Sequence, residues 1–326
     1  MMNPLDKIAG TLSADMEAVD SVIVENMQSS VALIPQLAGY LIAAGGKRIR
    51  PLLTLASTAI YGGDMVRAHN LAAVVEFIHS ATLLHDDVVD ESKVRRGQDS
   101  APQVFGNAAS VLVGDYLFSR SFQMMVADGS LEILRVLSDA SAIIAQGEVM
   151  QLSTANNLET SLDDYIEVVK AKTAALFAAG CEVGPMIAQA DLDQARAMAS
   201  YGMNLGIAFQ IADDVLDYRS SREAMGKAVG DDFREGKMTA PVIFAVQAAS
   251  AEERDFWVRT VGRRDQVDGD LERALEVFEA HGAMDKTMAL ARMYADLAKQ
   301  ALEAVPEGEL SAMLAGAADY AVERGE

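Results

Sequence analysis

Apolar residues recur at the spacing of an α-helix along almost the entire chain of 326 residues. Few segments alternate apolar and polar residues with the period of two that a half-buried strand would show. Alanine and methionine favour helices and are plentiful, and proline occurs at only seven positions. The sequence therefore predicts an all-α fold of roughly ten to twelve helices with no sheet.

No feature of the sequence divides the chain into parts. It has no Ser/Gly-rich linker, no low-complexity segment and no short repeat of the kind that builds a solenoid. Apolar residues make up 51% of the chain, which is enough to fill a large core. We therefore expect residues 1–326 to form a single domain.

The composition narrows the functions that the chain can have. Its net charge of −21 argues against nucleic acid as a partner, because a phosphate backbone is bound by lysine and arginine. Cys181 is the only cysteine, so no intrachain disulfide can form and a reducing compartment is expected. The acidic N-terminal segment shows no signal-peptide pattern. The predicted location is cytoplasmic.

One uncharged run, from Asn26 to Gly46, is long enough to be considered as a membrane span. Its polar residues and Pro35 favour instead a buried helix that is broken at this proline. A peripheral membrane contact stays open in case the product is a lipid.

Two acidic clusters stand at the polar ends of apolar stretches: DDVVD at 86–90 and DDVLD at 213–217. Helical residues four apart share a face, with Cβ atoms about 5–6 Å apart, so Asp86 and Asp90 would repel each other. A hard cation such as Mg²⁺ between them would reverse that effect. A single cluster would be interpreted as an acidic helix end facing water. Two clusters suggest opposite walls of one cavity that holds Mg²⁺ and substrate phosphates.

Basic residues gather in two short segments. Lys47, Arg48 and Arg50 follow a Gly-Gly pair near the start of a predicted helix, and a helix N-terminus itself favours anions. Arg95 and Arg96 follow the first acidic cluster, and arginine suits bidentate contacts with phosphate. These segments are either parts of a diphosphate clamp or ordinary basic loops.

His79 lies seven residues before Asp86, about two helical turns, and therefore on nearly the same face. It is either a core histidine with a satisfied hydrogen bond or a member of the same cavity wall, and the sequence leaves both interpretations open. His85 is rotated away from Asp86, and we expect it to be structural.

In combination, these motifs resemble the trans-prenyltransferases, the polyprenyl diphosphate synthases. GGKRIRP at 45–51, the first acidic cluster, RRG at 95–97 and FQIADDVLD at 209–217 occur in the order typical of that family. The resemblance runs from about Gly45 to about Pro241. It implies one large helical bundle of the isoprenoid synthase type with a central cavity.

The resemblance also assigns roles. It implies that roughly three Mg²⁺ ions are bound by four carboxylates, those of Asp86, Asp90, Asp213 and Asp217. It implies that isopentenyl diphosphate is held by Lys47, Arg50, His79 and Arg96. The other expected substrate contacts, for an allylic diphosphate such as farnesyl diphosphate, are Arg95, Lys172, Thr173, Gln210, Lys227 and Lys237. The residues expected to take part in the chemistry are Asp86, Asp90, Lys172, Gln210, Asp213 and Lys227. Asp87, Asp214 and Asp217 rank second among the carboxylates, and Asp87 is expected to orient its neighbours, because it is rotated about 100° from Asp86 on a helix.

Product length is expected to depend on Thr82 and Ala81, the fourth and fifth residues before Asp86. Short-chain members of the family carry an aromatic residue there, whereas both residues are small here. The resemblance then implies a long all-trans product, octaprenyl to decaprenyl, for quinone side chains. The alternative is that a later helix, around Phe118 or Phe122, closes the tunnel and gives a farnesyl or geranylgeranyl product.

Three rival interpretations belong to other classes. A terpene cyclase would share the fold, but its second metal motif is of an Asn/Ser/Glu type. A non-catalytic partner subunit would have lost acidic clusters, and this chain keeps both. A plain helical scaffold would bind no diphosphate. For the synthase we expect a homodimer.

Overall fold

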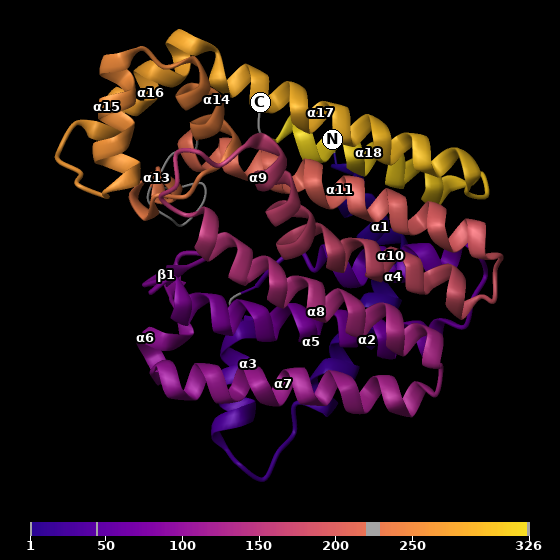
Figure 1. Ribbon diagram of the computed structural model, residues 1–326. Coiled ribbons are helices and arrows are strands. Elements are labelled where there is room, and N and C mark those ends of the chain that lie inside the picture. The colour runs from indigo at the N-terminus through magenta and orange to yellow at the C-terminus, as the bar shows by residue number, and fades with distance from the viewer. Residues whose placement is uncertain (1, 44, 220–228, 325–326) are drawn as a thin grey trace.

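The computed structural model describes residues 2–43, 45–219 and 229–324. Within these ranges the chain is almost entirely helical, as predicted (Figure 1). The α-helices are α1 (Pro4–Thr11), α2 (Ser13–Asn26), α3 (Leu33–Ala43), α4 (Ile49–Ile60), α5 (Met65–Val89), α6 (Ala101–Phe105), α7 (Asn107–Asp128), α8 (Leu131–Thr154), α9 (Leu162–Val169), α10 (Ala175–Ile187), α11 (Leu192–Arg219), α13 (Asp231–Glu235), α14 (Ala240–Ala248), α15 (Ala251–Trp257), α16 (Asp270–His281), α17 (Ala283–Ala301) and α18 (Glu309–Glu323). The helices are more numerous than predicted, because short ones stand between the long ones.

Two details of the prediction are wrong. The described chain contains one small sheet, an antiparallel pair of strands β1 (Val94–Arg95) and β2 (Gln98–Asp99). Arg96 and Gly97 between them have φ angles of 52° and 77°, the positive values that a tight two-residue hairpin requires. Pro35 does not break its helix, since α3 begins at Leu33 and the proline falls in the first turn, where its missing N–H has no helical acceptor.

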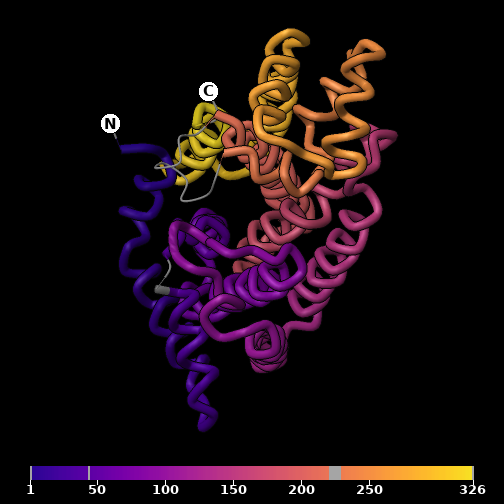
Figure 2. Tube along the Cα trace, turned by 90° about the vertical axis from the view of Figure 1, so that its left-hand side faces the viewer, coloured from indigo at the N-terminus to yellow at the C-terminus, as the bar shows by residue number. Residues whose placement is uncertain are grey.

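The long helices are arranged in layers around α5 and α11. Helix α5 packs against α4 on one side and α7 on the other, and α11 packs along α10 and α17. In Figure 1, α7 and α8 cross the lower half, α10 and α11 cross the middle, and α17 and α18 lie above them. Figure 2 shows the N-terminal helices at one side of this stack, where α1 packs against α18. One continuous apolar cluster joins the layers.

The fold brings the two acidic clusters to the same end of the bundle. Helix α5 begins at Asp64, whose carboxylate accepts hydrogen bonds from the backbone N–H groups of Val66 and Arg67. The helix ends as Asp90 caps its C-terminus. Between α9 and α10 the chain forms a π-helical segment, Lys170–Ala174, which faces α8 and α11. No helix in the described part of the chain has both the length and the apolar character needed to cross a bilayer.

Candidate active site

A cavity of about 570 Å³ lies between the C-terminal halves of α5 and α11. It brings together nearly all the residues that the motifs singled out, although they come from distant parts of the sequence. The predicted residues in its lining are Lys47, Arg50, His79, Thr82, Asp86, Asp90, Arg95, Arg96, Lys172, Thr173, Gln210, Asp213, Asp217 and Lys237. Ala81 is absent from this lining, and Lys227 lies outside the described residues.

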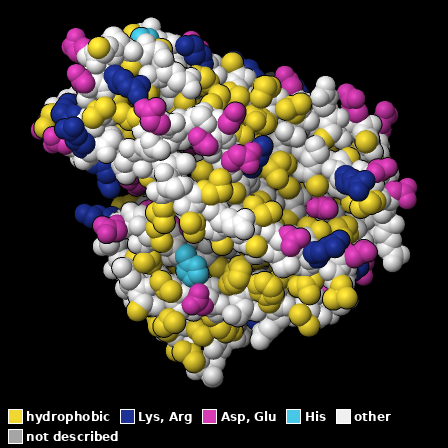
Figure 3. All heavy atoms as spheres, viewed as in Figure 1, with side chains coloured by type: hydrophobic (Ala, Val, Ile, Leu, Met, Phe, Trp, Pro, Cys, Tyr) yellow, Lys and Arg dark blue, Asp and Glu magenta, His cyan; other side chains and the backbone are white. Residues whose placement is uncertain are grey.

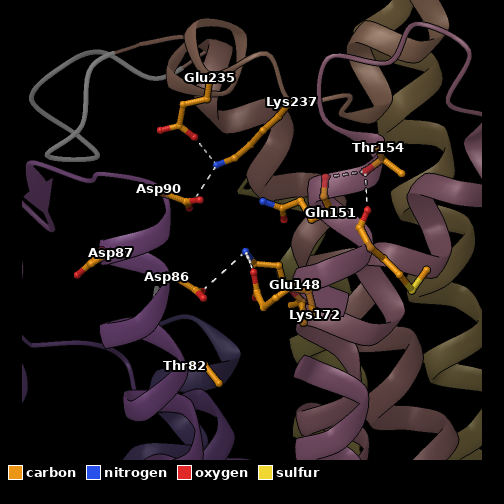
Figure 4. A network of polar contacts seen from close by, with 12 residues as sticks. Thr82, Asp86, Asp87, Asp90, Glu148, Gln151, Thr154, Lys172, Glu235 and Lys237 are labelled. Atoms are coloured by element: carbon orange, nitrogen blue, oxygen red, sulfur yellow. Dashed lines mark hydrogen bonds and ion pairs between the residues drawn. The ribbon is translucent and has the colours of Figure 1, made fainter. Parts of the chain in front are cut away.

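Asp86 and Asp90 of the first cluster face the cavity, and each lies opposite a lysine (Figure 4). The Lys172 ammonium is 3.8 Å from Asp86, and the Lys237 ammonium is 3.9 Å from Asp90. Burial raises the pKa of Asp86 to about 7, an effect that Lys172 opposes and that Glu148 and Asp90 increase. A buried carboxyl group beside other carboxylates ionises more readily when a further positive charge binds next to it.

Asp87 points away from the cavity, as predicted for an orienting residue (Figure 4). Its side chain is buried, and Arg95 donates a hydrogen bond of 2.7 Å to it from Nε. The Arg95 guanidinium therefore borders the cavity with part of its charge already compensated by Asp87.

The second cluster is arranged differently. The Asp213 carboxylate forms an ion pair of 2.9 Å with Arg324, beyond the end of α18. Asp214 is buried and accepts hydrogen bonds from the Tyr165 hydroxyl at 2.5 Å and the Gln210 amide at 2.8 Å. All three carboxylates of the cluster border the cavity, and Asp214 also ties α9 to α11 through Tyr165.

Three further members of this wall have fixed orientations. Thr173 donates a hydrogen bond of 2.9 Å to the Gln210 side-chain oxygen. Gln210 donates in turn to Asp214, so its amide cannot flip without losing both bonds. Asp217 is buried and accepts a hydrogen bond of 3.1 Å from the backbone N–H of Asp232.

The opposite wall of the cavity is basic. Nη1 of Arg50 lies 3.2 Å from Nε2 of His79. Because arginine can only donate, this His79 nitrogen accepts and the ring proton is on Nδ1. Burial and the charges of Arg50 and Arg96 lower the pKa of His79 well below its usual value, so the ring is neutral. Of the two interpretations of His79, the structure favours the cavity wall.

Gly46 makes the close packing of the basic residues feasible. Its φ is 152°, and a Cβ atom at this position would lie 2.5 Å from Nη1 of Arg96. A Cβ atom here would displace the Arg96 guanidinium from its place beside the loop. Arg48 is less available than predicted, because it forms an ion pair with Asp20 of α2.

Three charged residues of the site escaped the sequence analysis. Glu76 lines the cavity one turn before His79, and burial raises its pKa while Arg48, Arg50 and Arg96 lower it. Glu148 holds Lys172, and Arg324 holds Asp213. The helical spacing of Glu76 from His79 could have revealed the first, but Glu148 and Arg324 reach the site only through tertiary packing.

The donors present fit a hard divalent cation. The carboxylates of Asp86, Asp90 and Asp213 offer oxygen only, the ligand that Mg²⁺ prefers, and they border one cavity. Over the described ranges, no three acidic, histidine or cysteine side chains already converge as a complete metal-binding set. An incomplete oxygen set suits Mg²⁺, which keeps waters and substrate phosphates among its ligands.

Comparisons with known proteins identify the family of the chain. A sequence model of the polyprenyl synthetase family matches residues 31–278. The octaprenyl diphosphate synthase of Escherichia coli is 42% identical over 320 residues, which cover 98% of this chain and 99% of that protein.

Two solved structures are similar over their full length. A decaprenyl diphosphate synthase from Rhodobacter capsulatus has a TM-score of 0.94 and 50% identity, and the match covers 99% of each chain. A polyprenyl synthase from Caulobacter crescentus, solved with calcium and isoprenyl diphosphate, has a TM-score of 0.95 and 48% identity over 99% of this chain and 98% of that one. The chain therefore belongs to the polyprenyl synthetase family, which is the family that the order of its motifs predicts.

Proposed function

We propose that this chain is a trans-prenyltransferase that condenses an allylic diphosphate, such as farnesyl diphosphate, with successive molecules of isopentenyl diphosphate. The observation that carries the proposal is one cavity in which two carboxylate clusters face a wall of arginines and a neutral histidine. The proposed product is a long all-trans polyprenyl diphosphate, octaprenyl to decaprenyl, for quinone side chains. Relatives named octaprenyl diphosphate synthase, 40–42% identical over nearly the entire chain, support that length.

The allylic diphosphate is proposed to bind on the carboxylate side of the cavity. Asp86, Asp90 and Asp213 would hold roughly three Mg²⁺ ions, with Asp217 behind them. When bound, these ions supply positive charge where the departing diphosphate becomes negative. The Caulobacter crescentus relative was solved with calcium and isoprenyl diphosphate, which supports a divalent cation and this class of ligand. Lys172 and Lys237 add fixed positive charge from the cavity wall.

Isopentenyl diphosphate is proposed to bind on the basic side, to Lys47, Arg50, His79 and Arg96. Burial lowers the pKa of Arg50 to about 10, and its Nε has no hydrogen-bond partner within the described chain. The guanidinium carbon of Arg50 lies 4.5 Å from the centroid of the Phe177 ring, which holds the guanidinium by a cation–π contact. The N–H groups of Arg50 are therefore positioned before the substrate binds. The neutral His79 accepts from Arg50, so it holds that arginine in place.

The proposed reaction breaks the carbon–oxygen bond of the allylic diphosphate, and the electron pair leaves with the diphosphate. The double bond of isopentenyl diphosphate then forms the new carbon–carbon bond, and one proton is lost to the departed diphosphate. The oxygens of Thr173 and Gln210 border the place where the allylic cation would form, and they offer it dipoles. Exclusion of water by the surrounding helices protects the cation.

A shorter product is the second candidate. A short-chain isoprenyl diphosphate synthase from Methanothermobacter thermautotrophicus is 36% identical over 87% of this chain. Phe118 and Phe122 of α7 stack edge to face, with ring centroids 5.3 Å apart, and are partly buried against the core. A chain that grows from α5 towards α7 would end at these rings.

A second copy of the chain is the proposed partner. Helices α7 and α8 expose a row of large apolar side chains, and Figure 3 shows such side chains gathered over the lower half of this face. Patches of this kind mark protein contacts in proteins of this size. The members exposed by 60% or more on α7 and α8 are Leu112, Val126, Leu131, Val149 and Leu152. The peripheral membrane contact and the cytoplasmic location stay predictions.

The test is incubation of the purified protein with farnesyl diphosphate, labelled isopentenyl diphosphate and Mg²⁺, followed by chromatography of the products. We expect incorporation of label and products of octaprenyl to decaprenyl length. Products that stop at geranylgeranyl length would favour the second candidate. A cyclised hydrocarbon without incorporated label, or no reaction, would contradict the proposal. The Asp86→Ala variant is the background control.

A further inference from the structure

Glu148 of α8 lies beside a residue on which the proposed reaction depends. Its Oε2 lies 2.7 Å from the Lys172 ammonium, and the same ammonium is 3.8 Å from Asp86 (Figure 4). The side chains of Lys172 and Glu148 are 22% and 28% exposed. Lys172 therefore lies between two carboxylates from different helices, and the nearer one belongs to no acidic cluster.

The backbone beside Glu148 explains this short distance. A Cβ atom at Gly147 would lie 2.7 Å from the backbone nitrogen of Lys172 and 2.8 Å from Cβ of Ala171. Glycine thus lets α8 touch the π-helical segment Lys170–Ala174 directly. The extra residue in a π turn shifts the direction of the following side chains, and such turns are frequent at functional sites. Lys172 lies close to Glu148 because Gly147 of α8 and the π turn contact each other at this point.

The second carboxylate oxygen of Glu148 supports a role in the loaded site. Oε1 is buried and has no hydrogen-bond partner among the residues that the structure describes. A buried acceptor without a donor is costly, so residues that are purely structural normally avoid it. Glu148 thus uses one oxygen for Lys172, and the other stays buried without a donor in the described chain.

We propose that Glu148 is a positioning residue that holds the Lys172 ammonium in place and neutralises it until a diphosphate binds. This inference rests on the proposed function, because it assigns Lys172 to the diphosphate. In the free protein Glu148 pairs with the Lys172 ammonium. An incoming diphosphate must therefore compete with Glu148 for that ammonium. During turnover Glu148 restricts the long lysine side chain to the orientation that faces the departing group.

Glu148→Gln tests this role, since it removes the charge and keeps the size. In chelator without metal, titration with inorganic diphosphate should show affinity increased about threefold to tenfold, because Lys172 is freed. The kcat with farnesyl diphosphate should fall about tenfold, because the ammonium is no longer oriented. The KM for isopentenyl diphosphate should stay unchanged. A residue that only supports the fold would not move binding and turnover in opposite directions.

Two comparisons isolate the effect. In a Lys172→Gln background, Glu148→Gln should no longer strengthen diphosphate binding. An undiminished gain in affinity there would mean that the Glu148 carboxylate repels the diphosphate directly, and it would overturn the proposal. Glu167→Gln is the matched control, because Glu167 pairs with Lys170 at 2.7 Å, two residues from Lys172 but at the exposed surface. It should change neither quantity.

The remaining outcomes are also decisive. Unchanged diphosphate affinity in Glu148→Gln, with a melting temperature equal to that of the wild type, would overturn the proposal. If that variant unfolds, Glu148→Asp keeps the charge at a shorter reach and should lose turnover while keeping the weak metal-free binding. The binding arm needs no prenyl transfer, so a wild-type protein that fails to elongate isopentenyl diphosphate would refute the proposed function and leave this measurement intact.

Discussion

The two acidic clusters have the same spacing in the sequence but different surroundings in the fold. In the first, Asp86 and Asp90 face the cavity opposite lysines, and Asp87 is buried against Arg95. In the second, Asp213 alone is more than a third exposed, while Asp214 and Asp217 are only 4% and 7% exposed. We therefore expect the first cluster to share a cation between two carboxylates, and the second to add the Asp213 carboxylate from the other side.

The residues one turn before each cluster differ as well. Thr82 precedes Asp86 by four positions and lines the cavity with a small side chain. Phe209 precedes Asp213 by four positions, and its ring lies 5.7 Å from that of Phe177. Aromatic rings thus line the cavity beside the second cluster, and we expect a growing hydrocarbon to pass beside the first.

Loss of a carboxylate that faces the cavity should have the largest effect. We expect Asp86→Ala and Asp213→Ala each to reduce kcat by a factor of about 10³ or more. Each variant removes a carboxylate that would hold the Mg²⁺ ions, and these ions stabilise the negative charge of the departing diphosphate. Single-turnover kinetics would measure this, with circular dichroism as the check on folding. Near-normal turnover in either variant would refute the assignment of that cluster.

The difference between Thr82 and Phe209 leads to a prediction on product length. Thr82→Phe should shorten the product to about geranylgeranyl length. An aromatic ring would fill part of the cavity, and the close-packed wall around it cannot move to restore that space. Thr82→Val, nearly equal in size, should leave the length unchanged. Product chromatography measures both variants. Ala81 is a poorer position for this test, because it is buried towards α7, where its carbonyl lies near Gly114.

The buried part of the second cluster should matter for stability. Tyr165→Phe removes the donor to Asp214 and leaves a buried carboxylate oxygen unsatisfied, which should lower the free energy of unfolding by about 1–3 kcal/mol. Tyr116→Phe is the control, since its hydroxyl makes only an exposed hydrogen bond of 3.4 Å, and it should change stability by less than about 0.5 kcal/mol. If urea denaturation gave the same change in the free energy of unfolding for both variants, the hydrogen bond to Asp214 would contribute no more to stability than an exposed one.

The smallest effect should come from the raised pKa of Asp86. Burial raises this pKa from 3.8 to about 7, so the folded state holds the proton more tightly than the unfolded chain. The free energy of unfolding therefore falls as pH rises through this range. In chelator at pH 8, Asp86→Asn should melt about 2–5 °C above the wild type, and the gap should close near pH 4. A gap of the same size at both pH values would exclude ionisation as its cause.

The sequence could predict the clusters and the helices that carry them, because four-residue spacing and apolar stretches are local signals. It could also predict the basic wall, since Arg50 and Arg96 stand in motifs, whereas the role of His79 stayed open between two interpretations. The Glu148–Lys172 and Arg324–Asp213 pairs left no local signal, because each joins elements that only tertiary packing brings together. The π-helical segment at Lys172 and the hairpin after Asp90 depend on backbone angles that composition does not reveal.

The most direct test of this account is a crystal structure with inorganic diphosphate and Mn²⁺, located by its anomalous scattering as a stand-in for Mg²⁺. We predict Mn²⁺ ions bound by Asp86 and Asp90 on one side and by Asp213 on the other, at distances close to the roughly 2.0–2.1 Å typical of Mg²⁺. Asp87 and Asp214 should stay with Arg95 and Tyr165. Metal bound by Asp87 or Asp214, or by one cluster alone, would contradict the division of roles between the two clusters.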